Sequence, residues 1–209
     1  MWAMSTSPAP KTRTAARSYH HGNLRAALVA EGLAALEDSE RADVSLRELA
    51  RRVGVSPNAA YRHFADKDAL LAAMAAEGFR RFGAAAAAAQ AAPGRPAEQL
   101  RAQGRAYVKF ARDNPALFKL MFGSFAASNR SEELTQAGEL TFEGLRAGVA
   151  ASTRLPRDDE RVTVATVYAW GLVHGLSHLI LDGQLDEFGD LDAMTDAVLT
   201  FASTAGQQR

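Results

Sequence analysis

The chain has 209 residues, no cysteine, and equal numbers of cations and anions, with 24 Lys and Arg against 24 Asp and Glu. This length is enough for one medium domain or two small ones, with a core that needs no disulfides. The lack of cysteine excludes a disulfide scaffold, thiolate metal sites and cysteine nucleophiles. Zero net charge excludes a protein that is basic throughout, but not a local basic patch. Alanine, the best helix former, contributes 44 residues, so the composition favours an all-α fold.

The N-terminal residues 1–19 are predicted to be a disordered basic arm. They contain Lys11, Arg13 and Arg17 and no acidic residue, and they lack the apolar segment of a secretory signal. We therefore expect a cytoplasmic protein. Residues 162–181 contain no Asp, Glu, Lys or Arg and have the length of a membrane span. Because this stretch includes threonine, serine and two histidines, a buried interface helix is favoured, and no membrane is expected as a partner.

The first three predicted helices are short or medium in length. One begins at Leu24 and is followed by an acidic loop over 37–43. Ser45 and Glu48 form a capping-box pattern that opens a second helix, which Gly54 ends. Ser56 followed by Pro57 begins a third helix at once, because serine is a good N-cap and proline is favoured at the first helical position.

A longer fourth helix is predicted from Asp66, its N-cap, through the alanine-rich residues 84–92. Its apolar stripe is formed by Leu71, Met74, Ala75, Gly78, Phe79 and Phe82. The prolines at 93 and 96 end it. Further helices are predicted over 98–112, after the Asn114–Pro115 start, and over about 131–152, 158–182 and 190–204. No strand-like alternation occurs.

Two short helices joined by residues 54–56, after a longer helix, predict a helix-turn-helix over about 45–64. In such a motif the second helix enters the major groove of DNA. Charge agrees with this placement, since residues 1–81 carry 12 cations and nine anions, whereas residues 82–209 carry 12 and 15. Double-stranded DNA is therefore the expected partner of the N-terminal part.

These residues resemble a known family. The segment 45–71 reads SLRELARRVGVSPNAAYRHFADKDALL and, with the helix before it, is similar to the DNA-binding domain of TetR-family transcriptional repressors. Residues 19–25 (YHHGNLR), 114–122 (NPALFKLMF) and 170–175 (WGLVHG) resemble one branch, whose C-terminal ligand domain carries a Trp…His-Gly signature. The resemblance covers roughly residues 19–205.

The resemblance implies which residues contact DNA. Tyr61, His63 and Lys67 are expected on phosphates, and Asn58 is expected on a base edge, where an asparagine pairs with adenine. The full set of expected contacts is Ser45, Arg47, Ser56, Asn58, Ala59, Tyr61, Arg62, His63 and Lys67. Other interpretations remain: Tyr61 as a core aromatic, His63 as a helix cap, and Asn58 as a solvated side chain.

The C-terminal half is expected to bind an effector and a second subunit. Gly171 and Gly175 allow close helix approach, and with His178 they are the predicted dimer interface. The resembling family pairs the last two helices of each subunit in a four-helix bundle. A homodimer on an inverted-repeat operator follows, because one helix-turn-helix buries little surface. Residues that line an apolar effector pocket, or form plain core, are Tyr107, Phe110, Met121, Phe122, Phe125, Trp170 and His174.

The histidines of the C-terminal half allow another class of function. His174, His178 and Asp182 lie at i, i+4 and i+8, which suits a metal, so the alternative is a small helical metal-binding protein or enzyme. No zinc-protease, G-x-S-x-G, Walker A or Rossmann pattern occurs. We therefore expect no catalytic residue, metal or cofactor. A DNA-binding protein without an effector, such as an architectural factor, is a third possibility.

The expected organisation is all-α: a basic arm (1–19), a three-helix helix-turn-helix DNA-binding domain (20–66), a connecting helix (67–92) and a larger ligand-binding and dimerisation domain (93–205). The expected function is a DNA-binding transcriptional regulator, a repressor that a small apolar effector releases from its operator. The connecting helix would couple the two sites.

Overall fold

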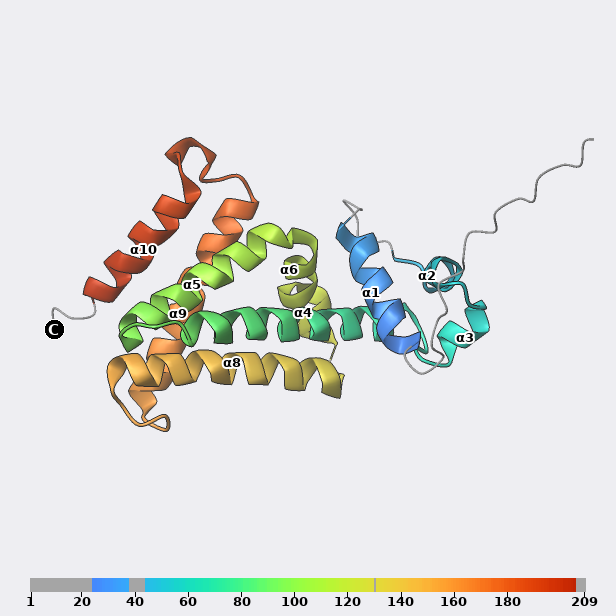
Figure 1. Cartoon of the computed structure of the whole chain (residues 1–209), viewed down its shortest axis with the longest axis horizontal. Helices are drawn as coiled ribbons and strands as arrows, with labels where there is room; N and C mark the ends of the chain where they lie inside the picture. The colour runs from blue at the N-terminus through green and yellow to red at the C-terminus, as the bar shows by residue number, and fades with distance from the viewer. Residues whose placement is uncertain (1–23, 38–43, 130, 206–209) are drawn as a thin grey trace, which may run out of the picture.

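The computed structural model describes residues 24–37, 44–129 and 131–205, and every regular element within them is helical (Figure 1). The predicted basic arm and most of the acidic loop lie outside these residues. The elements are α1 (Leu24–Glu37), α2 (Leu46–Val53), α3 (Pro57–Tyr61), α4 (Lys67–Gln90), α5 (Pro96–Asp113), α6 (Pro115–Phe122), α7 (Ser124–Ser128), α8 (Glu132–Thr153), α9 (Glu160–Leu181), η1 (Asp186–Phe188) and α10 (Leu191–Ala205). The all-α prediction, a helix-turn-helix followed by a larger helical domain, is confirmed.

Helices α1 to α3 form the N-terminal head. Their apolar side chains pack against one another and against the start of α4. Leu28, Leu49 and Phe64 are almost fully buried there. Gly54 ends α2 at φ 80°, a left-handed conformation that glycine adopts without strain. The Ser56 side chain caps α3 by accepting a hydrogen bond from the Ala59 N–H at 3.3 Å. The predicted helix-turn-helix geometry therefore rests on these two local stop and start signals.

The predicted capping box at the start of α2 is wrong. Ser45 is the N-cap, but its side chain makes no capping hydrogen bond. Glu48 instead accepts from Arg51 at 2.6 Å and from Arg52 at 3.2 Å. A bond between a carboxylate and a guanidinium group is stronger than a bond between a carboxylate and a neutral backbone N–H. The Glu48 side chain therefore points toward Arg51 and Arg52, at i+3 and i+4 on the same helix, and not back toward Ser45.

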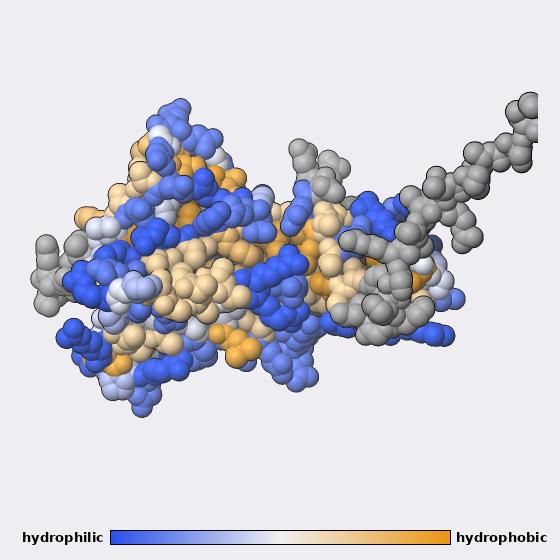
Figure 2. Space-filling view, in the orientation of Figure 1, coloured by the Kyte–Doolittle hydropathy of each residue, from blue (hydrophilic) through white to orange (hydrophobic). Residues whose placement is uncertain are grey.

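Helix α4 runs from the head into the larger domain (Figure 1). Asp66 caps it by accepting from the Ala69 N–H at 2.8 Å, as predicted, and the helix ends at Gln90, two residues before the expected end. Gly78 brings α4 close to α6, since a Cβ there would lie 2.6 Å from the Met121 sulfur. Its alanine-rich second half is mostly exposed, and Figure 2 shows it as pale orange surface.

Two further start signals differ from expectation. Pro96, predicted to end the preceding helix, is the first residue of α5, where Glu98 accepts from the Arg95 backbone N–H at 3.0 Å. Asn114 precedes α6, but its side chain makes no cap and donates back to the Phe110 carbonyl at 3.0 Å. The short helices α7 and η1 were not predicted, because segments of three to five residues carry too little periodicity.

The larger domain surrounds α4 and α5. Helix α4 packs along α8 and α5, α5 packs on α8 and α9, and α10 packs on α5 (Figure 1). Of the described helices, α9 alone is long and apolar enough to cross a membrane by length and composition. It packs on α5 and α8 along one face and exposes Val164, Val167, Tyr168 and Leu179 along another. An exposed apolar row on a packed helix is also what a subunit interface requires.

Candidate DNA interface and effector cavity

The predicted DNA contacts gather on the exposed surface of the head. Eight of the nine are exposed, and Ala59 is half-buried. Tyr61 is 42% exposed, so it is not a core aromatic. Asn58 and Ala59 lie in the first turn of α3, and Lys67 begins α4 close to the Asp66 cap. The surface therefore offers side chains of the types that bind phosphates and base edges.

Two other head arginines are engaged within the protein. Arg51 pairs with Glu48, and Arg52 pairs with both Glu48 and Glu31. The two guanidinium groups lower the pKa of Glu48 to about 2 by hydrogen bonding. These ion pairs neutralise part of the positive charge on α2.

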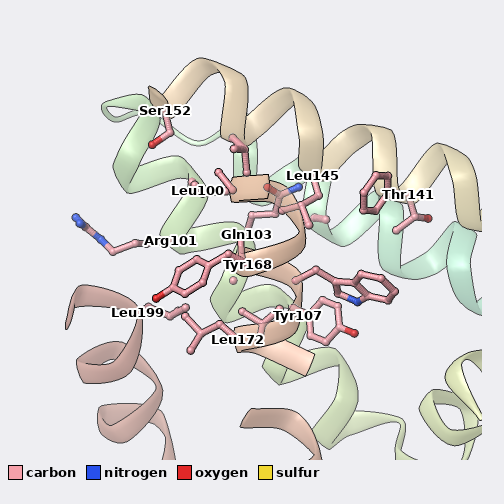
Figure 3. A pocket seen from close by; sticks show the side chains of 18 of the residues that line it. Leu100, Arg101, Gln103, Tyr107, Thr141, Leu145, Ser152, Tyr168, Leu172 and Leu199 are labelled. Carbon is pink, nitrogen blue, oxygen red and sulfur yellow. The ribbon is translucent and has the colours of Figure 1, made fainter. Parts of the chain in front are cut away.

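A large cavity lies in the larger domain, between α4, α5, α8, α9 and α10. Its volume is about 1090 Å³, at the upper end for small-molecule sites. Figure 3 shows side chains from several helices converging on it. Most of the lining is apolar: Phe79, Phe82, Leu100, Phe122, Phe142, Leu145, Val149, Tyr168, Trp170, Leu172, Val173 and Leu199 are among its residues. Arg101, Glu139 and Glu143 are the charged residues of the lining.

The predicted pocket residues divide between several places. Tyr107, Phe122 and Trp170 line the large cavity. Met121 and His174, again with Phe122 and Trp170, line an adjacent hollow of about 670 Å³. Phe110 packs against Phe82, with ring centroids 5.4 Å apart, and Phe125 is partly buried against the core.

Several cavity residues were missed by the sequence analysis, including Gln103 on α5, Thr141, Phe142 and Leu145 on α8, and Tyr168 on α9. For one of these residues, Gln103, the sequence does contain a signal. Gln103 lies four residues before Tyr107 and three after Leu100, so it is a polar residue on the apolar face of α5. It is only 6% exposed.

Tyr107 bonds one residue of the predicted signature and lies beside the other. Its hydroxyl lies 2.8 Å from His174 Nδ1, within hydrogen-bonding distance. The His174 ring in turn packs beside Trp170, with ring centroids 5.9 Å apart. Burial, and then the neighbouring His178, lower the pKa of His174, while burial raises the pKa of Tyr107.

The histidine cluster does not form a three-ligand metal site. The rings of His174 and His178 lie 4.7 Å apart between centroids. Within the described part of the chain, no group of three or more His, Cys, Asp or Glu is arranged to hold a metal ion. Asp182 is thus not brought together with the two histidines, and His174 already uses Nδ1 in the bond to Tyr107.

The predicted interface residues lie on α9. Gly171 and Gly175 are exposed, and a Cβ built on either would meet no described atom within 4 Å. His178 is half-buried and packs against Phe118, with ring centroids 5.6 Å apart and the ring planes tilted by 59°. The two glycines and the apolar side chains around them thus form a smooth face on this protomer.

Comparison with known families decides the assignment. Residues 41–74 match the model of bacterial regulatory proteins of the tetR family, and residues 100–202 match the tetracyclin repressor-like C-terminal domain. Together the two models cover more than half of the chain. The chain belongs to the TetR family of transcriptional regulators.

Solved structures agree with this TetR fold. A Rhodococcus sp. RHA1 protein of unknown function is 33% identical, with a TM-score of 0.75 over 91% of this chain and 96% of its own. A tetR-family regulatory protein from Rhodococcus RHA1 is 20% identical, with a TM-score of 0.63 over 86% and 95%. FadR of Bacillus subtilis, solved with stearoyl-CoA, is 13% identical, with a TM-score of 0.63 over 84% and 95%. No curated protein matches the sequence.

Membership of the TetR family establishes the class of function. The protein is a DNA-binding transcriptional regulator whose N-terminal domain is a helix-turn-helix. Regulators of this family bind DNA operators and small-molecule ligands, are soluble and typically cytoplasmic, and are not enzymes. The alternative of a small helical enzyme built on His174 and His178 is therefore set aside.

Proposed function

We propose that this TetR regulator is a repressor, which binds an inverted-repeat operator as a homodimer and leaves it when a small apolar effector fills the large cavity. The main observation behind this proposal is that α4 runs from the DNA-binding head to the wall of the cavity. This helix begins at Lys67, a proposed phosphate contact, and farther along it contributes Phe79, Phe82 and Ala86 to the cavity wall. An occupant of the cavity therefore touches the helix on which the head is mounted.

The coupling follows from unequal binding to two states of the dimer. A ligand shifts an equilibrium only by its difference in affinity for the two states. The alanine-rich half of α4 is largely exposed and carries little side-chain bulk, so it can tilt with small losses of packing. A tilt of α4 moves the two α3 helices away from the spacing of successive major grooves, about 34 Å.

For the dimer we propose the exposed face of α9 around Gly171, Gly175 and His178. Its apolar neighbours Val164 and Val167 are exposed in the protomer, and burying them against a partner would remove apolar area from water. The bundle would combine α9 and α10 of each subunit. The boundaries proposed for the units are 20–66 for the head, 67–92 for the connecting helix and 93–205 for the ligand and dimer domain.

On DNA we propose two kinds of contact. Tyr61, His63 and Lys67 bind phosphates and position the head, whereas Asn58, in the first turn of α3, reads a base edge. The remaining contacts are Ser45, Arg47, Ser56, Ala59 and Arg62. All except Ala59 are exposed on the head, which supports this surface as the interface.

We also propose that the Trp…His-Gly signature has a structural role in the effector domain. His174 hydrogen bonds the Tyr107 hydroxyl at 2.8 Å and packs beside Trp170, with ring centroids 5.9 Å apart. Because Trp170 and Tyr107 line the cavity, His174 would hold these two wall residues in place. FadR was solved with stearoyl-CoA, whose long acyl chain, though not its anionic coenzyme A head, is of the apolar kind proposed for this cavity.

The deciding experiment selects bound sequences from a random double-stranded DNA pool with the full chain. An inverted repeat with half-sites one helical turn apart is expected for the proposed dimer. The operator is then titrated with a candidate effector, and the effector is titrated with and without operator. The effector must lower operator affinity by the same factor by which the operator lowers effector affinity, because the two sites are thermodynamically linked. Enrichment of a single half-site would contradict the dimer, and equal effector affinities would show that the ligand is not an inducer.

A further inference from the structure

Gln103 is a polar side chain of the cavity lining with a buried hydrogen-bonding atom that makes no hydrogen bond. Gln103 is only 6% exposed, and its Oε1 atom is buried and makes no hydrogen bond. The residue lines the large cavity and extends from α5 toward Leu145 of α8 (Figure 3). Its amide has room because Gly148 faces it: a Cβ on Gly148 would lie 2.8 Å from Oε1. A buried amide oxygen without a partner destabilises the empty protein.

Neighbouring polar groups of the cavity differ from Gln103 in this respect. The Thr141 hydroxyl bonds the carbonyls of Ala137 and Phe79, at 2.9 and 3.3 Å. The Thr153 hydroxyl bonds the Val149 carbonyl at 2.9 Å. These hydroxyls are satisfied by their own backbone, so Gln103 is the better candidate to receive a ligand group.

The charge of the lining disfavours an anionic ligand. Arg101 is the one cation among the lining residues, and its guanidinium points away from the other labelled side chains of the cavity (Figure 3). Two carboxylates, Glu139 and Glu143, are exposed on the other side of the lining. A carboxylate or phosphate buried near Gln103 would have no cation beside it there, and an unpaired buried charge is costly.

We propose that Gln103 selects the effector by its polar group, and that the effector is an uncharged, mainly apolar molecule with one hydroxyl or carboxamide. A primary or secondary amide, like a hydroxyl, both donates and accepts. The terminal torsion of a glutamine is broad, so the Gln103 amide turns readily to present nitrogen or oxygen. The inference rests on the proposed effector role of the cavity.

The test uses four probes of equal chain length: 1-decanol, decanamide, 1-chlorodecane and decanoate. Calorimetric titration of the full chain should give dissociation constants for decanol and decanamide about tenfold lower than for chlorodecane and decanoate, since one buried hydrogen bond has about this effect. Gln103→Met, which keeps the linear shape, should abolish the preference. The matched control Thr141→Val should keep it, because the Thr141 hydroxyl is satisfied within the protein.

Thermal unfolding separates a ligand-binding role from a structural one. Because Gln103→Met removes an unpaired buried oxygen, the empty variant should melt about 2–4 °C higher than the wild type. A lower melting temperature would show that Gln103 serves the fold, and would overturn the proposal. Equal affinity for decanol and chlorodecane, or tighter binding of decanoate, would also overturn it. Failure of all four probes to bind would instead contradict the proposed effector role of the cavity, on which the inference rests.

Discussion

Arg25 on α1 and Glu133 on α8 form an ion pair that joins the DNA-binding head to the larger domain. The Arg25 guanidinium also lies 5.2 Å from the centroid of the Phe64 ring, just beyond α3. Arg80 of α4 contacts the same carboxylate at 3.2 Å. Both partners of the first pair are partly exposed, so the pair adds only about 0–1 kcal/mol to stability. The effect of these contacts is on orientation, because the Glu133 carboxylate of α8 contacts both Arg25 of the head and Arg80 of α4.

If the Arg25–Glu133 pair orients the head for the operator, Glu133→Ala should lower operator affinity by about 2- to 5-fold, the most that a pair contributing about 1 kcal/mol can supply. The direction of this change distinguishes an orienting role from a simple charge effect. Removing an anion would by itself strengthen binding to DNA, because it lowers the repulsion from the phosphates. Arg25→Ala should act similarly, and the double variant should lose no more than either single one. The measurement is operator titration by fluorescence anisotropy.

The matched control for that cycle is Glu132→Ala, which removes the same charge one residue away. Glu132 is exposed and accepts a bond from Gln136 within α8. If Glu133→Ala strengthened binding as much as Glu132→Ala, the ion pair would have no orienting role.

Substitution of the proposed phosphate contacts should weaken binding to related sequences alike. Tyr61→Phe, His63→Ala and Lys67→Ala each remove a group that carries little sequence information. Lys67→Ala should also reduce the slope of log affinity against log salt by about 0.9. Titrations of operator and scrambled DNA at several salt concentrations check this. An unchanged slope in Lys67→Ala would remove that residue from the interface.

Base reading by Asn58 makes a different prediction. Asn58→Ala should relax the preference at one operator position by about 1–3 kcal/mol, because a bidentate pair with adenine is lost. Affinity for a variant operator changed at that position should stay nearly constant. Selection from a random pool with wild type and Asn58→Ala gives the comparison, and identical selected motifs would assign Asn58 to solvent.

The proposed dimer face can be tested without unfolding the protomer. Gly171→Leu and Gly175→Leu place a side chain where the described structure is open, and leucine is the better helix former. We therefore expect a monomer of undiminished thermal stability in sedimentation, with operator affinity lost. Gly144→Leu on α8, where a Cβ also meets no described atom within 4 Å, should remain dimeric. Persistence of the dimer in both α9 variants would place the interface elsewhere.

Stability should fall as the pH is lowered through the range in which the unfolded His174 titrates. Burial lowers its pKa in the folded protein below the ordinary 6.5, so the unfolded chain binds the proton more readily. The stability from neutral His174 is thus complete above pH 6.5 and is lost as the pH falls toward its folded pKa. Melting temperatures between pH 7.5 and about 5 should decline less in His174→Gln than in the exposed-site control His63→Gln. Parallel pH profiles would contradict this role for His174.

Much of the helical framework was predictable because its signals are local. Gly54 and the Ser56–Pro57 pair set the turn between α2 and α3, and Asp66 sets the start of α4, each through its own backbone and the next few residues. The predicted apolar stripe of α4 is buried or half-buried, but residues 70–76 are buried on every side of the helix, which the stripe did not predict. Where two partners compete for one group, local reasoning was insufficient: Glu48 bonds Arg51 and Arg52 in place of the backbone of Ser45.

The position of the cavity, and the contact between the head and the larger domain through Arg25 and Glu133, depend on tertiary structure. An apolar residue on the inner face of a helix packs against core or lines a void depending on helices distant in sequence. Phe110 therefore packs on Phe82, whereas Tyr168, on the largely exposed α9, lines the cavity. The Arg25–Glu133 pair joins residues 108 positions apart, which no periodicity reveals. The sequence alone determined the helices and their class of partner through short-range caps and spacing; only the packing of those helices determined where space and unpaired polar atoms remain.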